Sequence, residues 1–382
     1  MIFIILTVCL FVLYSALILA YRAGWRRYST DFPIEENLTL PKISIIIPAR
    51  NEAENIGKCL QSILANNYPA ALLEIIVIDD FSEDDTDKIA ACILEKRNGR
   101  VLLLKDYLSE GERLNSYKKK ALEIAIGEAS GDWIVTTDAD CIVSDNWLKQ
   151  LSIAMNNGRT QFIAAPVSFA PYSTPDLLYY FQSLDFMTMQ GITAASIKNN
   201  MGNMCNGANL AFRKSAFKEV GGYKGIDHIA SGDDMLLMHK IQTKFPNGIV
   251  YLKSEAAIVQ TPAQPDWKSF LNQRIRWSSK ADKYNDKKLT MILALVYFFN
   301  LNFLILTIAA LFNPHLWYWL LGTLAAKVLT ELIFLAPVAK FYKKSNEIFY
   351  FALLQPIHII YIIFAGFLGK FGSYKWKGRT VK

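Results

Sequence analysis

Two acidic clusters in this chain have residue types and positions suited to binding a diphosphate and accepting a proton. The first, Asp138-Ala139-Asp140, directly follows the apolar run Trp133 to Thr137, which is typical of a buried strand. Carboxylates at a strand end can hold a divalent cation, which neutralises the charge of a leaving diphosphate. The pattern therefore predicts metal and diphosphate binding at Asp138 and Asp140, and the alternative is a solvated turn.

The second cluster, Asp233-Asp234, precedes the apolar residues Met235 to Met238. A carboxylate can accept the proton of a hydroxyl group whose oxygen attacks a carbon atom. It does so only if burial or a neighbouring charge raises its affinity for the proton, and Asp233 supplies such a charge beside Asp234. The alternative is an ordinary helix N-terminus that carries two acids.

A third group, Gln273-Arg274-Ile275-Arg276-Trp277, places cations next to an aromatic plane. These side chains suit a leaving pyrophosphate and an acceptor sugar or lipid head group, through charge-assisted hydrogen bonds and stacking. The alternative is a basic amphipathic helix at a membrane surface with no catalytic part.

The elements that must position these groups alternate between short apolar runs and amphipathic stretches, from about residue 41 to residue 287. The predicted strands are Lys42 to Pro48, Glu74 to Ile78, Val101 to Leu104 and Trp133 to Thr137, and the predicted helices are Asn55 to Ala65 and Lys118 to Ala129. This alternation predicts an α/β fold with a parallel sheet covered by helices. Ligands then bind at the carboxyl ends of the strands.

Long apolar runs at both ends of the chain predict an integral membrane protein. The chain has 382 residues, 52% of them hydrophobic, and a net charge of +7. Ile2 to Tyr21 is about long enough to cross a hydrocarbon core of about 30 Å. The positive residues Arg22, Arg26 and Arg27 follow this run instead of preceding it. They predict an uncleaved anchor rather than a signal peptide, with the following chain in the cytoplasm.

Three further runs, Met291 to Phe312, Leu316 to Ala339 and Ile348 to Leu368, are predicted membrane segments. Lys327 and Glu331 lie four residues apart inside the second run, so they either pair or extend separately towards the membrane surface. Three crossings would place the basic tail outside, against the positive-inside rule. We therefore expect a break in the last run, which contains Gln355, Pro356 and His358, and a cytoplasmic tail.

The five cysteines have no CxxC spacing, and the four histidines are dispersed. This distribution predicts neither a zinc site nor a disulfide framework, and favours buried cysteines in a reducing compartment. The positive charge lies mainly at the membrane flanks. For that reason the sequence predicts no nucleic-acid partner.

In this order, the motifs resemble those of the membrane-bound family 2 glycosyltransferases, inverting enzymes with a GT-A fold that move a sugar from a nucleotide diphosphate to an acceptor. Pro48-Ala49-Arg50-Asn51-Glu52 matches the end of the family's first strand, and Asp79-Asp80-Phe81-Ser82 matches the paired acid after the second. Phe81 stands where the family usually has glycine. The resemblance implies a nucleotide-sugar site formed by Pro48, Arg50, Asn51, Glu52, Asp79, Asp80, Lys118 and Asp138.

The resemblance also assigns the later motifs. Asn206 to Arg213, with Asn209 among them, would form the acceptor side of the pocket. Asp234 occupies the position of the family's catalytic base, and Asp233 replaces its glutamate. Gln273, Arg276 and Trp277 would bind the acceptor or the diphosphate from a helix at the membrane surface, whereas Arg274 is outside the motif. Asp138 and Asp140 would hold Mg²⁺ or Mn²⁺.

The function implied is transfer of a sugar from a UDP- or GDP-sugar to a lipid-linked or membrane-embedded acceptor. A processive polysaccharide synthase is the alternative enzyme, and an inactive membrane scaffold or nucleotide-sugar sensor is the alternative of another class. The expected organisation is an anchor at residues 1–21, a cytoplasmic glycosyltransferase domain at 41–287, a membrane region at 291–369 and a basic tail at 370–382. The expected location is a bacterial-type cell membrane.

Overall fold

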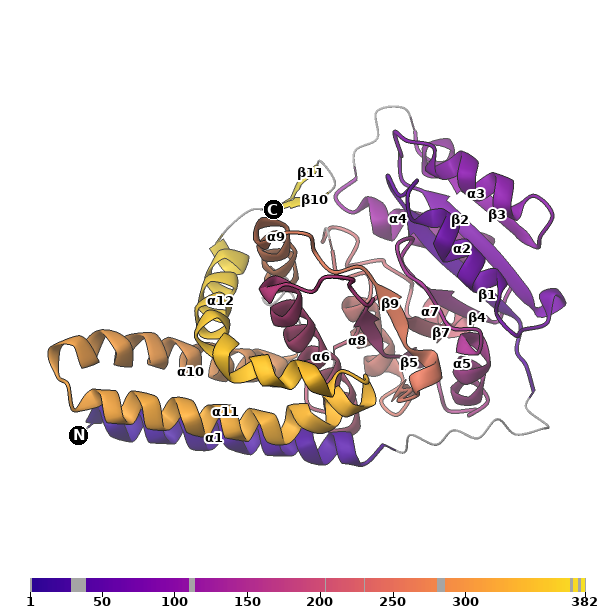
Figure 1. The fold of residues 1–382 in the computed structure, drawn as a ribbon. Helices are drawn as coiled ribbons and strands as arrows, with labels where there is room; N and C mark the ends of the chain where they lie inside the picture. The colour runs from indigo at the N-terminus through magenta and orange to yellow at the C-terminus, as the bar shows by residue number, and fades with distance from the viewer. Residues whose placement is uncertain are drawn as a thin grey trace. The chain divides into compact units, whose positions relative to one another are not determined.

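The computed structural model describes residues 2–28, 39–109, 114–202, 204–229, 231–279, 286–371, 374–376 and 379–381 (Figure 1). The chain forms two compact units. The sheet unit comprises Ser29–Ala170 and Met204–Pro262, and the helical unit comprises Met1–Tyr28, Pro171–Asn203 and Ala263–Lys382. The predicted glycosyltransferase domain at 41–287 therefore contains residues of both units.

Four neighbouring parallel strands of the sheet unit confirm the strands predicted from the sequence, each within two residues at either end. They are β1 (Ile43–Ala49), β2 (Leu73–Asp79), β3 (Gly99–Leu103) and β4 (Trp133–Thr136). The seven-stranded sheet has the order β3-β2-β1-β4-β7-β5-β8. Its remaining strands are β5 (Phe162–Ala164), β7 (Leu210–Arg213) and β8 (Ile249–Tyr251), of which β7 is antiparallel to both β4 and β5. The sheet is thus mainly parallel, as predicted.

The other elements of the sheet unit include six helices. These are α2 (Ile56–Leu64), α3 (Thr86–Leu94), α4 (Tyr117–Glu128), α5 (Trp147–Met155), α7 (Lys214–Glu219) and α8 (Met235–Lys244), and the strands β6 (Val167–Phe169) and β9 (Val259–Thr261) form a separate parallel pair. Ile45, Ile46 and Ile47 of β1 are fully buried, as are Leu60 and Ile63 of α2. Burying each such side chain contributes about 1.5–3 kcal/mol, which holds the strand ends in place.

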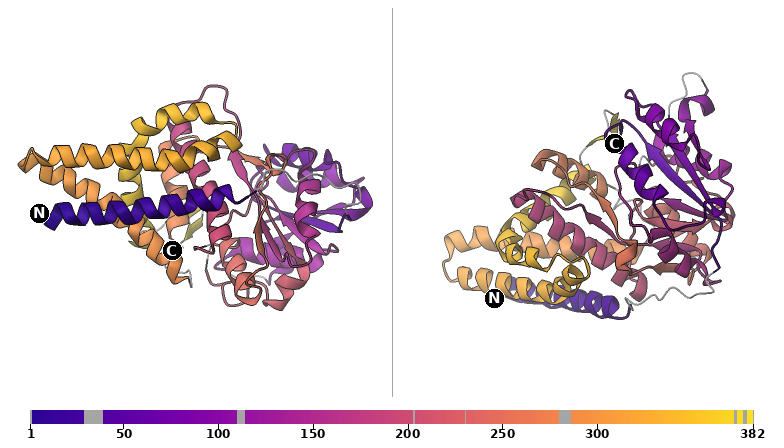
Figure 2. Two further views of the ribbon diagram at one scale, coloured as in Figure 1. Left: turned by 90° about the horizontal axis from the view of Figure 1, so that it is seen from below. Right: turned by 45° about the vertical axis from the view of Figure 1, so that its right-hand side comes forward.

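The helical unit contains four helices that are long and apolar enough to cross a membrane, within the part of the chain that the structure describes. They are α1 (Ile2–Arg26), α10 (Lys287–Phe312), α11 (Leu316–Phe341) and α12 (Phe351–Phe371), and the unit also contains α6 (Leu177–Asn199) and α9 (Trp267–Ser278). Helix α1 lies alongside α11, as Figures 1 and 2 show. One N-terminal and three C-terminal membrane segments were predicted, and their positions agree.

Helix α12 stays helical through Pro356, but Figure 1 shows that it turns sharply along its length, so the last apolar run is bent rather than interrupted. Its polar residue Gln355 accepts a hydrogen bond from Lys327 at 2.5 Å and donates one to Glu331 at 3.0 Å. A neighbouring helix therefore satisfies the side chain that suggested a break. Lys327 and Glu331 also form the predicted ion pair, at 2.8 Å.

The end of the chain and the cysteines complete the description. Tyr374–Trp376 (β10) and Arg379–Val381 (β11) form an antiparallel pair, whereas Lys377 and Gly378 of the tail lie outside the described residues. Cys59 and Cys141 are buried, as predicted, but Cys9 and Cys92 are exposed. Burial, together with nearby aspartates, raises the pKa of Cys59 to about 12, which keeps this thiol protonated.

Candidate active site

Some of the predicted site residues line a small cavity of about 10 Å³ at the carboxyl ends of the strands of the sheet unit, namely Pro48, Lys118, Asp138, Asp233 and Asp234. Pro48 comes from the end of β1, and Asp138 follows β4 by two residues. The lining residues that could do chemistry are Lys118, Asp138, Asp233, Asp234 and Tyr223. Parallel strands bring their carboxyl ends to one edge, so residues 20 to over 100 positions apart converge there.

Lys118 lies between the two acidic clusters. Its Nζ is 3.0 Å from Asp138 Oδ1 and 3.3 Å from Asp233 Oδ2. Burial acts to lower the pKa of Lys118, but the charges of Asp138 and Asp233 outweigh it and raise that pKa above its ordinary value. The lysine is therefore a fixed positive charge in the cavity, where a diphosphate could use it.

Asp234 is held in a defined orientation by two backbone N–H groups. It is the N-cap of α8, and its Oδ1 accepts a hydrogen bond from Met235 N at 2.7 Å. Its Oδ2 accepts one from Gly207 N at 3.0 Å, and Thr136 at the end of β4 donates to Gly207 O at 2.9 Å. The helix-cap interpretation and the site interpretation of this acid are therefore compatible, since one carboxylate fulfils both.

Asp233 forms an ion pair in addition to its position beside Asp234. Its Oδ2 lies 3.3 Å from Lys118 Nζ, so Asp233 helps to hold the lysine in the cavity. The catalytic part predicted for Asp233 beside Asp234 stays a prediction.

The loops after β1 and β2 are bound to each other. Arg50 Nη1 donates to Asp80 O at 2.7 Å, and Asn51 donates through its backbone N to Ser82 Oγ at 3.0 Å. Glu52 donates through its backbone N to Thr86 Oγ1 at 2.8 Å. These contacts bring together both segments that the resemblance assigns to the nucleotide.

Phe81 adopts the left-handed backbone conformation, with φ +56°, that the family's glycine allows without strain. For a bulky side chain this conformation costs about 1 kcal/mol or more. The ring packs edge-on against Tyr117, with a centroid distance of 6.0 Å. The loop geometry that the substitution left in doubt is consistent with a phenylalanine.

Asp79 is the last residue of β2, and one of its carboxylate oxygens receives no hydrogen bond from the described residues. Its Oδ2 accepts a hydrogen bond from Ser82 N at 3.0 Å, whereas Oδ1 is buried and has no hydrogen-bond partner among the described residues. Buried carboxylate oxygens normally have donors. This oxygen is therefore a candidate acceptor for a donor group of a ligand.

Asn209, predicted to face the acceptor or the diphosphate, has the geometry of a structural residue. Its exposed fraction is 0%. Its Oδ1 accepts from Trp147 Nε1 at 3.0 Å, and its Nδ2 donates to Pro166 O and Ala257 O, both at 2.8 Å. All of its polar atoms are used within the protein, so we leave it out of the site proposed below.

Gln273, Arg276 and Trp277 lie on α9, which belongs to the helical unit. All three side chains are partly exposed, whereas Arg274 is buried. Arg274, which is outside the motif, and Arg276, which belongs to it, therefore lie in different environments. The predicted contact of the partly exposed residues with the acceptor or diphosphate stays a prediction.

One residue that supports the cavity, Lys119, was missed in the sequence. Lys119 is 1% exposed, and its Nζ donates to the carbonyls of Ile226, Ile229 and Ser231 at 2.6–2.9 Å, which holds the segment before Asp233. Its spacing from the buried residues of α4 indicates the inward face of that helix. Tyr223 is also buried, and burial and the charges of Asp233 and Asp234 raise its pKa, so it stays neutral.

Asp138 and Asp140 supply hard oxygen donors suited to Mg²⁺ or Mn²⁺. Asp138 keeps 39% of its side-chain surface exposed, so a ligand can reach it. Among the described residues, no group of three or more His, Cys, Asp or Glu side chains is placed to hold a metal. Asp138 lines the cavity, and Asp140 Oδ1 accepts a hydrogen bond from Cys141 Sγ at 3.5 Å. Carboxylates of this kind would suit a cation that takes its other ligands from a diphosphate and water.

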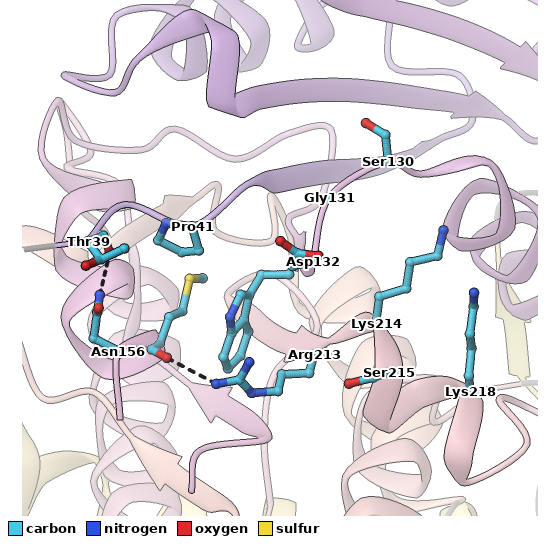
Figure 3. A pocket seen from close by; sticks show the side chains of 12 residues that line it. Thr39, Pro41, Ser130, Gly131, Asp132, Asn156, Arg213, Lys214, Ser215 and Lys218 are labelled. Carbon is cyan, nitrogen blue, oxygen red and sulfur yellow. Dashed lines mark hydrogen bonds between the residues drawn. The ribbon is translucent and has the colours of Figure 1, made fainter. Parts of the chain in front are cut away.

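A larger cavity, of about 590 Å³, lies at the opposite, amino-terminal edge of the same strands (Figure 3). It is lined by Ser130, Gly131 and Asp132 before β4, and by Arg213, Lys214 and Lys218. Arg213 Nε donates to Thr160 O at 2.9 Å, and Lys214 Nζ donates to Gly127 O at 3.1 Å. Two of its three cations are therefore bound to backbone carbonyls.

Comparisons with known protein families give the class to which this fold and site belong. A model described as "Glycosyl transferase family 2" matches residues 44–221, and one described as "Glycosyl transferase family group 2" matches residues 133–368. The second match covers more than half of the chain. The chain therefore belongs to the family 2 glycosyltransferases.

Known relatives differ in how much of their length is matched. "Glycosyltransferase AglE" of Haloferax volcanii is 29% identical over 197 residues, which are 52% of this chain and 60% of AglE. "Hyaluronan synthase" of Streptococcus pyogenes is 27% identical over 248 residues, which are 62% of this chain and 56% of the synthase. The chain thus spans less than two thirds of the length of these two relatives.

A solved structure resembles nearly the whole chain. It is the mannosyltransferase PcManGT from Pyrobaculum calidifontis in complex with GDP-Man and Mn²⁺. The TM-score is 0.58 at 20% sequence identity, covering 93% of this chain and 99% of that chain. The likeness shows the fold and confirms the predicted GT-A architecture.

Proposed function

We propose that the protein transfers a sugar, with inversion, from a UDP- or GDP-sugar to a lipid-linked or membrane-embedded acceptor. The observation that carries this proposal is the convergence of Lys118, Asp138, Asp233 and Asp234 at the carboxyl ends of β1 and β4. The ammonium group of Lys118, between Asp138 and Asp233, is suited to bind a diphosphate. The oriented carboxylate of Asp234 is suited to accept a proton.

The nucleotide would bind at the linked loops after β1 and β2. The unpartnered Oδ1 of Asp79 is suited to accept a hydrogen bond from a base or ribose, and Asp80, Arg50, Asn51 and Glu52 would shape the same pocket. Lys118 would contact the diphosphate. The complex of PcManGT with GDP-Man and Mn²⁺ supports a nucleotide sugar and a divalent cation for this fold.

Asp234 would act as the general base. Its carboxylate takes the proton of an acceptor hydroxyl while that oxygen forms a bond to the anomeric carbon. The bond from that carbon to the diphosphate oxygen breaks on the opposite face, which inverts the configuration. Asp138 and Asp140 would hold a divalent cation, which would supply positive charge near the leaving diphosphate. Lys118 provides a second, permanent charge there.

The acceptor is proposed to be a lipid because four helices could cross a membrane. Gln273, Arg276 and Trp277 would bind the acceptor or the diphosphate. The positive residues Arg22, Arg26 and Arg27 at the end of α1 favour a cytoplasmic sheet unit, and we place the protein in a bacterial-type cell membrane. Similarity to a hyaluronan synthase favours a processive synthase as the second candidate. The convergence of Lys118 with Asp138, Asp233 and Asp234 in one cavity argues against an inactive scaffold or sensor.

A donor and acceptor screen in detergent tests the proposal. The donors would be GDP-mannose, UDP-N-acetylglucosamine and UDP-glucose, and the acceptors a polyprenyl phosphate and a diacylglycerol, each with Mn²⁺ or with EDTA. We expect one extracted lipid product that carries a single sugar and requires the metal. A ladder of longer products would favour a synthase. Neither transfer nor donor hydrolysis with any pair would favour a scaffold.

Cysteine labelling tests the orientation. Single cysteines at Ser109 and Lys287, in a background without the exposed Cys9 and Cys92, should resist an impermeant reagent in intact cells and react after lysis. Labelling from the outer face would overturn the cytoplasmic assignment. Ser373 lies outside the described residues, and we expect the same protection there.

A further inference from the structure

Within the helical unit, the buried Arg274 is paired with an acid that lies 89 positions earlier in the chain. Its Nε donates to Asp185 Oδ2 at 3.0 Å, and its Nη2 lies 2.8 Å from the same oxygen. The exposed fractions are 1% for the Arg274 side chain and 6% for Asp185. Asp185 belongs to α6, so this ion pair joins α6 to α9.

Arg274 also contacts two residues of the motif predicted to bind the acceptor or diphosphate. Its Nη1 donates to Gln273 Oε1 at 3.1 Å. Its guanidinium carbon lies 4.1 Å from the centroid of the Trp277 ring, which is close enough for a cation–π contact. One guanidinium group thus touches both Gln273 and Trp277. Lysine could not reproduce this arrangement, because it has no planar fork.

Besides Arg274 on α9, Asp185 has a charged or polar neighbour on α12. His358 Nε2 lies 3.8 Å from Asp185 Oδ1, and α12 packs directly against α9. Removing the carboxylate would leave the Arg274 charge buried without its acid, and a buried unpaired charge is strongly unfavourable. The guanidinium group would then shift, and both of its motif contacts depend on its position.

We propose that Asp185 is a positioning residue for glycosyl transfer: it fixes Arg274, which in turn fixes Gln273 and Trp277 for the acceptor. This inference rests on the proposed function, because it assigns the acceptor to those two residues. Arg274 has a structural role, whereas the partly exposed Arg276 is the arginine of this segment that is predicted to contact a ligand.

The test compares Asp185→Asn with Glu331→Gln, a matched change of a buried acid to its amide. Glu331 pairs with Lys327 in the same unit and hydrogen-bonds to Tyr14 and Gln355, not to the motif. With polyprenyl phosphate as acceptor, we expect Asp185→Asn to raise the acceptor KM at least ten-fold. The KM for GDP-mannose or UDP-N-acetylglucosamine should stay within two-fold. Glu331→Gln should leave both values within two-fold, whatever its effect on unfolding temperature.

Tryptophan emission provides a readout that does not need turnover. Asp185→Asn should change the emission of the protein, and this change should disappear in a Trp277→Phe background because the altered contact is that of Arg274 with Trp277. Glu331→Gln should cause no Trp277-dependent change. If Asp185→Asn does not fold, Arg274→Lys keeps the charge but loses the fork, and should give the same KM split and emission change.

The outcomes distinguish a failure of the role inferred for Asp185 from a failure of the proposed function on which it rests. An Asp185→Asn protein with unchanged acceptor KM and no Trp277-dependent emission change would overturn the inference. Equal losses in Asp185→Asn and Glu331→Gln would also overturn it, since both would then reflect stability alone. If Trp277→Ala itself leaves the acceptor KM unchanged, the acceptor assignment fails, and the emission result still decides whether Asp185 positions Trp277.

Discussion

The amino-terminal edge and the carboxyl edge of the seven-stranded sheet, where the parallel strands begin and end, each have a cavity lined by charged side chains. The partners of those charged side chains differ between the two edges. At the amino-terminal edge the cavity is about 590 Å³, and Arg213 and Lys214 are bound to backbone carbonyls. At the carboxyl edge the cavity is only about 10 Å³, yet Lys118 is shared between acids of two separate clusters. Converging charges, rather than cavity size, therefore indicate the candidate site.

The largest expected effect is that of Asp234→Asn at the carboxyl edge. We expect transfer to fall by about 10²- to 10⁴-fold, the usual contribution of general base catalysis. Donor affinity should stay within a few-fold, because the base acts in the transition state. Initial rates and calorimetric donor binding measure both. A dead Asp233→Asn with an active Asp234→Asn would make Asp233 the base, and full turnover by both would contradict the mechanism.

Asp138→Ala and Asp140→Ala should both abolish most transfer and the Mn²⁺-dependent part of nucleotide binding. Asp138 is partly exposed at the strand end, so we expect that variant to stay folded. Binding of UDP and GDP with Mn²⁺ and with EDTA measures the effect, and circular dichroism checks the fold. Metal dependence equal to that of the wild type would count against the assignment.

Lys118→Met should weaken nucleotide-sugar binding by about 10- to 100-fold, because a hydrogen bond to a charged group contributes about 1.5–3 kcal/mol. Lys120, which pairs with Glu123 at 3.7 Å on the surface, supplies the matched control, and Lys120→Met should change binding less than two-fold. Lys119→Met should instead lower the unfolding temperature. Equal binding by the Lys118 and Lys120 variants would remove Lys118 from the site.

Glu74→Gln tests whether the acid at the amino-terminal edge serves stability. Burial acts to raise the pKa of Glu74, but hydrogen bonds from Ser130 and Ser44 and the charge of Arg100 lower it overall from 4.5. A lowered pKa contributes stability that is present above 4.5 and is lost as the pH falls through the folded-state value. The unfolding temperature of the wild type should fall below pH 4.5, and that of the variant should fall less over the same pH range. Its kcat at neutral pH should be unchanged, and a large fall would contradict this division of roles.

The smallest expected effect is that of Lys218→Ala in the larger cavity. This lysine is exposed, and the cavity plays no part in the proposed reaction. Transfer rate and donor KM should stay within two-fold of the wild type. A ten-fold loss in the same assay would show that the amino-terminal edge also contributes to function.

Local sequence patterns were sufficient to predict those strands, helices and acidic residues whose positions depend on neighbouring residues in the chain. The four parallel strands and helices α2 and α4 agree with prediction because their apolar residues repeat with a regular period. The acids that follow β4 and those that precede the residues of α8 were found because strand ends and helix N-termini can be recognised from neighbouring residues in the sequence. The short strands β5, β7 and β8 were not predicted.

The amino-acid sequence by itself determined the membrane-length helices, the parallel strands and the positions of the acids, because each depends on residues close together in the chain. Only the tertiary structure decided which charges face one another. Lys118 and Lys119 are adjacent, yet one enters the cavity and the other binds three carbonyls. Asp185 and Arg274 are far apart, yet they form a buried pair. Coulombic and hydrogen-bond energies depend on distance in space, which local periodicity does not specify.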